Sequence, residues 1–165
     1  MQQAQGAIDA ARAAGADQYA HDEYVAAQES LKRARDAVAN RDYRLALDHA
    51  LDSRERAQNA AKQTADNKAI ARADADRALV NAAAALTEAR NRLKAAAASH
   101  RSAPAVLAAR RTIADSEAAV QKARAAFKEG DYRSVIGTMP AVTAHLRGAA
   151  RDLEALVSPA ARRRR

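Results

Sequence analysis

Cysteine and tryptophan are absent from the 165-residue sequence, and other aromatic residues, glycine and proline are rare. The lack of cysteine excludes disulfides, thiol catalysis and thiolate metal sites. One Phe, four Tyr and eight Val are too few for a β-sandwich, a barrel or a doubly wound sheet, whose strands need β-branched and aromatic residues. Five Gly and three Pro leave few loops on which catalytic groups could stand. No apolar run approaches the length of about 18 residues that a membrane span needs.

Alanine dominates the composition, with 50 of the 165 residues. Leu, Ile, Val and Phe together supply only 24. Few large apolar residues and a net charge of +8 are compatible with disorder, whereas an excess of Ala, Glu, Lys, Leu and Arg is typical of long helices and coiled coils. The spacing of the apolar residues decides between these two classes.

Large apolar residues recur every seven positions in four segments. The stripes are Tyr24, Leu31 and Val38; Leu79, Leu86 and Leu93; Val106, Ile113, Val120 and Phe127; and Tyr132, Met139, Leu146 and Leu153. A period of seven keeps one stripe facing a partner helix along a left-handed supercoil. The sequence therefore predicts an all-α protein, built as an elongated antiparallel coiled coil or helical bundle.

Turn signals divide the chain into helices. Gly favours the position after a helix and Asp the position before one, and we expect helices at 2–14, 19–39, 42–98, 104–129 and 132–157. The segment 42–98 contains no Gly or Pro, which favours one continuous helix; a break near Thr64–Asn67 is the alternative. We expect two three-helix units that share this helix. The smaller N-terminal unit spans 1–66, the C-terminal three-helix bundle spans 67–157, and a basic tail spans 158–165.

The predicted hairpin of 79–98 and 104–129 places large side chains opposite small ones. With residue 101 at the turn, Leu93, Leu86 and Leu79 face Ala109, Ser116 and Ala123, while Val106, Ile113, Val120 and Phe127 face Ala96, Ala89, Ala82 and Ala75. Small residues opposite large ones let helices approach closely. Much of the alanine is thus predicted to serve helix packing.

An internal repeat with an offset of 89 aligns residues 29–44 with residues 118–133. Both copies end in the tripeptide Asp-Tyr-Arg, at Asp42-Tyr43-Arg44 and Asp131-Tyr132-Arg133. The Asp can cap the following helix, and the Tyr ring can lie over the last apolar residue of the preceding helix, Val38 or Phe127. The repeat favours a duplicated hairpin, with chance similarity between alanine-rich helices as the alternative.

No arrangement of residues indicates a catalytic, metal or cofactor site. The four histidines, His21, His49, His100 and His145, are too far apart in sequence to share a metal on one helix. The sequence has no Gly-rich phosphate loop, no serine elbow and no His-Glu-x-x-His motif. We therefore expect a protein that is not an enzyme and that needs no cofactor.

Charge is unevenly distributed along the chain. Residues 1–88 carry 12 basic and 14 acidic groups, whereas residues 89–165 carry 16 basic and 6 acidic groups, and no acid lies between 89 and 114. In the predicted bundle this basic window and the tail meet at one end. The candidates for contact with an anionic partner are Arg90, Arg92, Lys94, Arg101, Arg110, Arg111, Arg162, Arg163, Arg164 and Arg165.

An anionic lipid or lipopolysaccharide surface, an acidic protein or nucleic acid would each suit such an end. Nucleic acid is the less favoured partner, because no aromatic residues stand among these basic residues to stack on bases. A solvated basic end that serves only solubility is the simplest alternative. The alanine-rich stripes also suit a protein partner or self-association through helix faces.

The segment Ala14-Gly15-Ala16-Asp17-Gln18-Tyr19-Ala20 begins a longer pattern, which continues with Leu31, Ala34, Ala37, Asp42-Tyr43, Ala46, Ala50, Ala57 and Ala60. Over about residues 8–100 this pattern resembles an uncharacterised alanine-rich helical domain of Gram-negative envelope lipoproteins. That family commonly has Pro after Tyr-Ala, where this chain has His21. Its members often carry a lipoprotein signal, and some carry a peptidoglycan-binding domain after the helices.

The resemblance implies a periplasmic helical protein, tethered to the outer membrane, with no assigned activity and no functional residues to transfer. Residues 1–20 show no signal-peptide pattern, so we expect either a mature form whose signal was removed or a cytoplasmic chain. The leading hypothesis is a non-enzymatic structural or adaptor protein of the cell envelope. A cytosolic, nucleic-acid-associated basic helical protein is the alternative.

Overall fold

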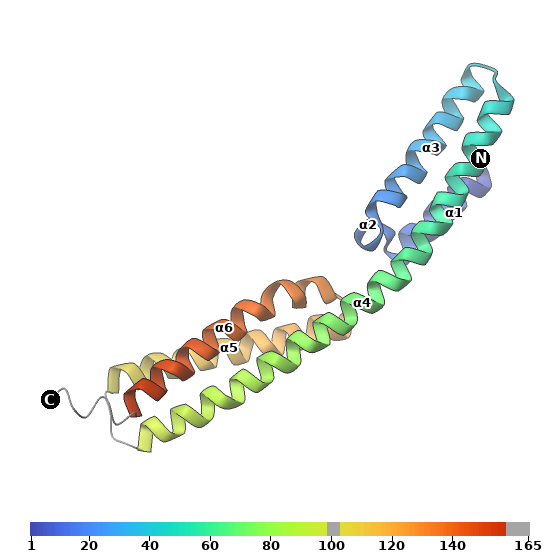
Figure 1. Ribbon diagram of the computed structural model, residues 1–165. Helices are drawn as coiled ribbons and strands as arrows, with labels where there is room; N and C mark the ends of the chain where they lie inside the picture. Colours follow the sequence, from blue (N-terminus) through green and yellow to red (C-terminus); the bar gives the residue numbers. More distant parts are fainter. Residues whose placement is uncertain (99–102, 158–165) are drawn as a thin grey trace. The chain divides into compact units, whose positions relative to one another are not determined.

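The computed structural model describes residues 1–98 and 103–157, and these residues form six helices and no strands (Figure 1). The helices are α1 (Gln2–Ala14), α2 (Ala16–Tyr19), α3 (His21–Ala39), α4 (Tyr43–Ala98), α5 (Ala103–Glu129) and α6 (Tyr132–Val157). The all-α prediction is confirmed. The expected helix at 19–39 begins at His21 instead, because Gly15 and Ala20 bound a separate single turn, α2.

Helix α4 is unbroken through Thr64–Asn67, as the absence of Gly and Pro predicts. The chain nevertheless divides into two compact units, Met1–Ile70 and Ala71–Arg165, so α4 contributes its first half to one unit and its second half to the other. The sequence placed this boundary at residue 66. Each unit has its own core and is described separately.

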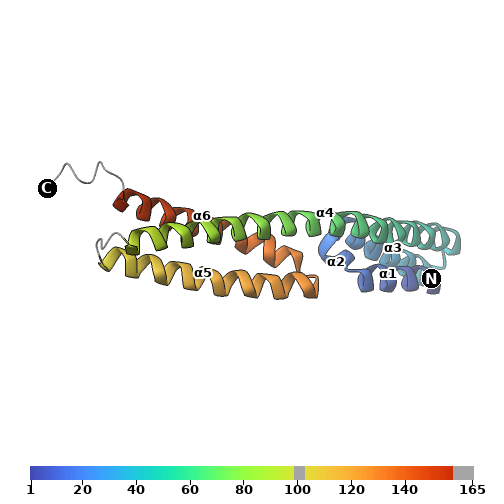
Figure 2. The ribbon, with the colours of Figure 1, turned by 90° about the horizontal axis from the view of Figure 1, so that it is seen from below.

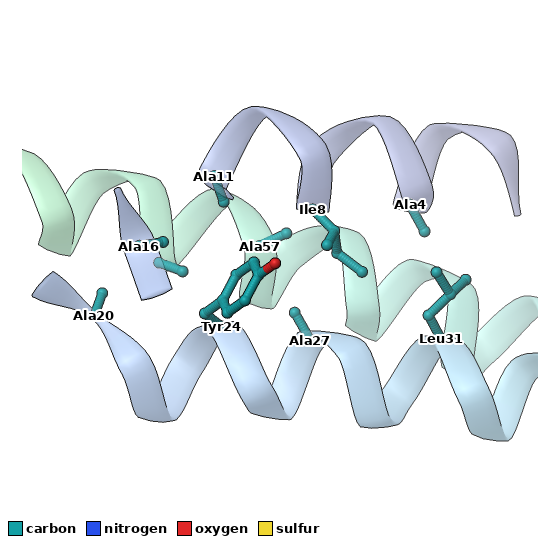
Figure 3. Packing of buried hydrophobic residues seen from close by; sticks show 10 residues of the cluster. Ala4, Ile8, Ala11, Ala16, Ala20, Tyr24, Ala27, Leu31 and Ala57 are labelled. Atoms are coloured by element: carbon teal, nitrogen blue, oxygen red, sulfur yellow. The ribbon is translucent and has the colours of Figure 1, made fainter. Parts of the chain in front are cut away.

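In the first unit, a few large side chains of α1 and α3 pack onto alanines of α4. Figure 3 shows Ile8 of α1 and Tyr24 of α3 beside Ala57 of α4, and Leu31 belongs to the same buried cluster. The buried positions of α4 in this unit are all small: Ala46, Ala50, Ser53, Ala57, Ala60 and Thr64. The two hydroxyls among them donate to backbone carbonyls, so no unpaired polar group results.

In the second unit, α5 and α6 run alongside the second half of α4 (Figure 2). Ala82 shares a buried cluster with Val120, Ala89 with Ile113, and Ala96 with Val106, which confirms the predicted hairpin register. Helix α6 covers the hairpin with four side chains that are almost fully buried: Val135, Met139, Leu146 and Leu153. Large-against-small packing thus accounts for the alanine content.

The two turns that carry the repeated tripeptide have the same hydrogen-bond pattern. The amides of Asp42 and Asp131 each donate to the carbonyl five residues earlier, at 2.9 Å in both turns. Each aspartate then accepts a bond from the backbone amide three residues later, at 3.0 Å and 3.1 Å respectively. The residue before each aspartate has a positive φ, 61° at Arg41 and 85° at Gly130.

The tyrosines of the two turns differ. The Tyr132 ring contacts Phe127 edge to face, with centroids 5.2 Å apart, as the sequence predicted. In the first turn, Tyr43 is 69% exposed, and Val38, which takes the place of Phe127, is 42% exposed. The first turn therefore leaves its aromatic ring on the surface. The backbone of the turn is repeated, whereas the burial of its side chains is not.

Candidate cationic interface

Five of the ten predicted basic candidates lie in the described part of the second unit. Arg90, Arg92 and Lys94 stand on the last turns of α4, and Arg110 and Arg111 on the third turn of α5. The buried cluster of Ala96, Val106, Ala109 and Leu153 places these segments at the same end of the three-helix bundle. Arg101, Arg162, Arg163, Arg164 and Arg165 lie outside the described residues.

Two of these five basic residues are engaged in ion pairs between helices. The guanidinium of Arg90 donates to the carboxylate of Glu117 on α5 at 2.7 Å. Arg92 pairs with Glu154 on α6 at 3.1 Å, and its other Nη lies 4.0 Å from Glu88. Both arginines therefore tie α4 to its neighbours, and the sequence missed this role because their main partners lie far away along the chain.

Lys94, Arg110 and Arg111 are exposed, and no ion pair joins them to any residue in the described ranges. Asp115 stands one turn after Arg111 on α5, and Asp152 of α6 lines the groove between α5 and α6. Neither carboxylate lies within ion-pair distance of the three basic groups. Their charges are thus directed to solvent, where a partner could meet them.

An apolar residue accompanies these charges. Leu107 is 52% exposed and stands one turn before Arg110 and Arg111 on the same helix. Sequence reasoning missed it because Leu107 lies outside the heptad stripe that begins at Val106. The signal available in the sequence was a leucine that does not belong to the heptad stripe and so has no predicted partner helix.

A groove of about 370 Å³ runs between α5 and α6 at this end of the second unit. It is lined mainly by small residues, with Leu153 and Leu156 as its large apolar contacts and His145 and Asp152 as its titratable ones. Within residues 1–98 and 103–157, no group of three His, Asp or Glu side chains is arranged to hold a metal ion.

The first unit contains a polar network that joins α3 to α4. Ser30 Oγ donates to Asp52 Oδ2 at 2.6 Å, and Arg56 Nε donates to the same carboxylate at 3.0 Å. Arg56 also lies 3.7 Å from Glu23. The hydrogen bond from Ser30, assisted by Arg56, lowers the pKa of Asp52 below its usual value of 3.8, against the opposing effect of partial burial.

The first unit also exposes several large apolar residues near the start of α4. Tyr43, Leu47 and Leu51 recur every four residues and are 69%, 59% and 46% exposed. This spacing forms one continuous apolar stripe, which suits contact with a protein partner. A groove of about 410 Å³ lies beside this stripe, and it is lined by Leu47, Leu51 and the first residue of the chain, Met1.

Among the described helices, none is long and apolar enough to cross a membrane. Residues 1–76 match the family described as a domain of unknown function (DUF4398). The match covers the whole of the first unit and only the first residues of the second. No curated protein and no solved structure matches the chain.

Proposed function

We propose that this chain is a non-enzymatic helical structural or adaptor protein of the bacterial cell envelope. One end of its second unit offers positive charge to an anionic surface or an acidic partner. The envelope location rests on the resemblance of the first unit to a domain of envelope lipoproteins, and residues 1–76 match a domain without assigned function.

The observation that carries the proposal is the contrast between two sets of basic side chains. Arg90 and Arg92 are neutralised by carboxylates of α5 and α6. Lys94, Arg110 and Arg111 have no such partner among the described residues, although they stand on the same helix ends. Surface cations without local partners keep a long-range attraction for anions, which salt weakens.

The adaptor role is supported by the apolar stripe of the first unit. Tyr43, Leu47 and Leu51 are not covered by any residue that the structure describes, and contiguous exposed apolar side chains often mark protein contacts. Either a protein partner or a second copy of this chain could bury them. Size-exclusion chromatography with light scattering distinguishes these cases, since self-association would depend on the concentration of the purified chain.

A cytosolic, nucleic-acid-associated role is the second candidate, and the net charge of +8 favours it. The ring of Tyr132, in the second of the two repeated turns, is already packed on Phe127. Binding would therefore depend on phosphate contacts alone, with a steep loss of affinity as salt rises.

Fractionation of cells that express the native gene, with its own upstream sequence and a C-terminal tag, tests the proposal. We expect a lipobox upstream of Met1 and recovery of the protein with the envelope. Recovery in the cytosol, with salt-dependent retardation of DNA that is lost when Arg162–Arg165 are deleted, would favour the second candidate instead.

A further inference from the structure

Near its start, α5 exposes an apolar residue, Leu107, next to two basic ones, Arg110 and Arg111, with no acid between them. At about 100° per residue, Leu107, Arg110 and Arg111 point to one side of α5, away from the buried Val106 and Ala109. We call this side, over residues 104–118, the outer α5 face; its exposed residues are Pro104, Leu107, Arg110, Arg111, Ala114 and Ala118.

Two of the three acids of α5 lie on the flanks of the outer α5 face, and the third, Glu129, is the last residue of the helix. Asp115 stands on one flank and Glu117 on the other, and Glu117 is engaged by Arg90 at 2.7 Å. Between these two flanks the face has two arginines, Arg110 and Arg111, and no carboxylate.

The side chains between the cations are small or apolar. Ala114 and Ala118 are exposed alanines that let the helix backbone approach a flat surface, and Leu107, 52% exposed, projects beyond them. On an anionic bilayer, an exposed leucine beside arginines can enter the headgroup region while the cations meet the lipid phosphates.

From this arrangement we infer that the outer α5 face binds a bilayer surface that contains anionic lipids. The inference rests on the proposed function, since it names the anionic partner of the same end of the molecule. One leucine supplies little apolar area, so binding is mainly electrostatic and falls as the salt concentration rises. The face lies on the membrane surface, and none of the described helices spans the bilayer.

Co-sedimentation of the full chain with vesicles tests the inference. We expect binding to phosphatidylcholine vesicles that contain a quarter phosphatidylglycerol at low salt, and loss of binding to pure phosphatidylcholine or at high salt. The double variant Arg110→Gln/Arg111→Gln should bind about tenfold or more weakly, because each basic residue at an anionic surface contributes roughly a fivefold factor. Leu107→Ser should weaken binding by a few fold.

Two matched controls locate the effect on the outer α5 face. The double variant Arg147→Gln/Arg151→Gln removes two positive charges from exposed positions of α6. The variant Val80→Ser removes an apolar side chain of α4 that is 60% exposed. Both controls should bind vesicles nearly as well as the unchanged chain. If the α5 and α6 double variants lose vesicle binding equally, the assignment of lipid binding to the outer α5 face is overturned.

Duplex DNA of thirty base pairs and polyglutamate serve as the other anionic probes. If the chain ignores the anionic vesicles but binds either polymer through Arg110 and Arg111, the lipid inference is overturned and the cationic end of the proposed function stands. If vesicles, DNA and polyglutamate all fail to bind, both the inference and the cationic end are wrong.

Discussion

Ser30 on α3 donates a 2.6 Å hydrogen bond to Asp52 on α4, and Ser30 is buried while Asp52 is only partly so. Replacing Ser30 by Ala should lower the free energy of unfolding by about 1 kcal/mol at pH 7, a value reduced for the exposure of the carboxylate. This change is measured by urea denaturation, with unfolding monitored by circular dichroism. Ser134→Ala, at an exposed position, is the control and should change little.

The pH dependence of the same bond has a definite sign. The folded protein lowers the pKa of Asp52 below 3.8, so this carboxylate adds stability that is complete above the unfolded pKa. That stability is lost as the pH falls through the lowered folded pKa, in the window below about pH 4. The difference in the free energy of unfolding between the unchanged chain and Ser30→Ala should therefore shrink as the pH is lowered from about 5 to about 2. A difference that stays constant over this range would contradict this account.

The repeated turn predicts opposite effects at two equivalent positions. Arg41 has a left-handed φ of 61°, which costs a residue with a Cβ roughly 1–2 kcal/mol. Arg41→Gly relieves this strain but gains freedom in the unfolded chain, so we expect a net stabilisation of about 0.5 kcal/mol. Gly130→Ala introduces the strain at φ 85° and should destabilise by about 1 kcal/mol. Thermal unfolding of the two variants checks both signs.

The large-against-small layers predict intolerance to added volume. Ala82 is fully buried in the cluster that contains Val120, so Ala82→Leu should destabilise the chain by about 1–3 kcal/mol. Adding Val120→Ala should recover part of this loss, because the two positions share one layer. Ala84→Leu, at an exposed position two residues later, should change stability by less than about 0.5 kcal/mol.

Arginines that form ion pairs between helices should differ from the exposed arginines of α5 in their effect on the free energy of unfolding. Arg90→Gln/Arg92→Gln breaks pairs whose side chains are about half exposed, and should lower the free energy of unfolding by about 1 kcal/mol at low salt. Arg110→Gln/Arg111→Gln should leave it unchanged, since no ion pair to a described residue is lost. Equal destabilisation by both double variants would show that Arg110 and Arg111 also support the fold.

Local pattern was sufficient for most of the architecture. Heptad spacing and the turn residues at Gly15, Asp42 and Gly130 predicted the helix boundaries to within one or two residues, apart from the extra turn α2. The pairing of layers in the hairpin also followed, because the predicted alignment places a large apolar side chain opposite Ala or Ser at each layer. These signals act over a few residues or along one stripe, so they can be read from the chain itself.

Which side chains are available to a partner was decided by the tertiary structure. Arg90 and Arg111 look alike in the sequence, yet Arg90 meets Glu117 across the hairpin while Arg111 faces solvent. The exposure of Leu107 and Leu47 likewise depends on where a neighbouring helix lies. Charge pairing and burial are set by the rotation of each helix about its axis against its neighbours. The sequence by itself therefore determined the helices and their packing stripe, and only the packed bundle separated structural arginines from those free to bind.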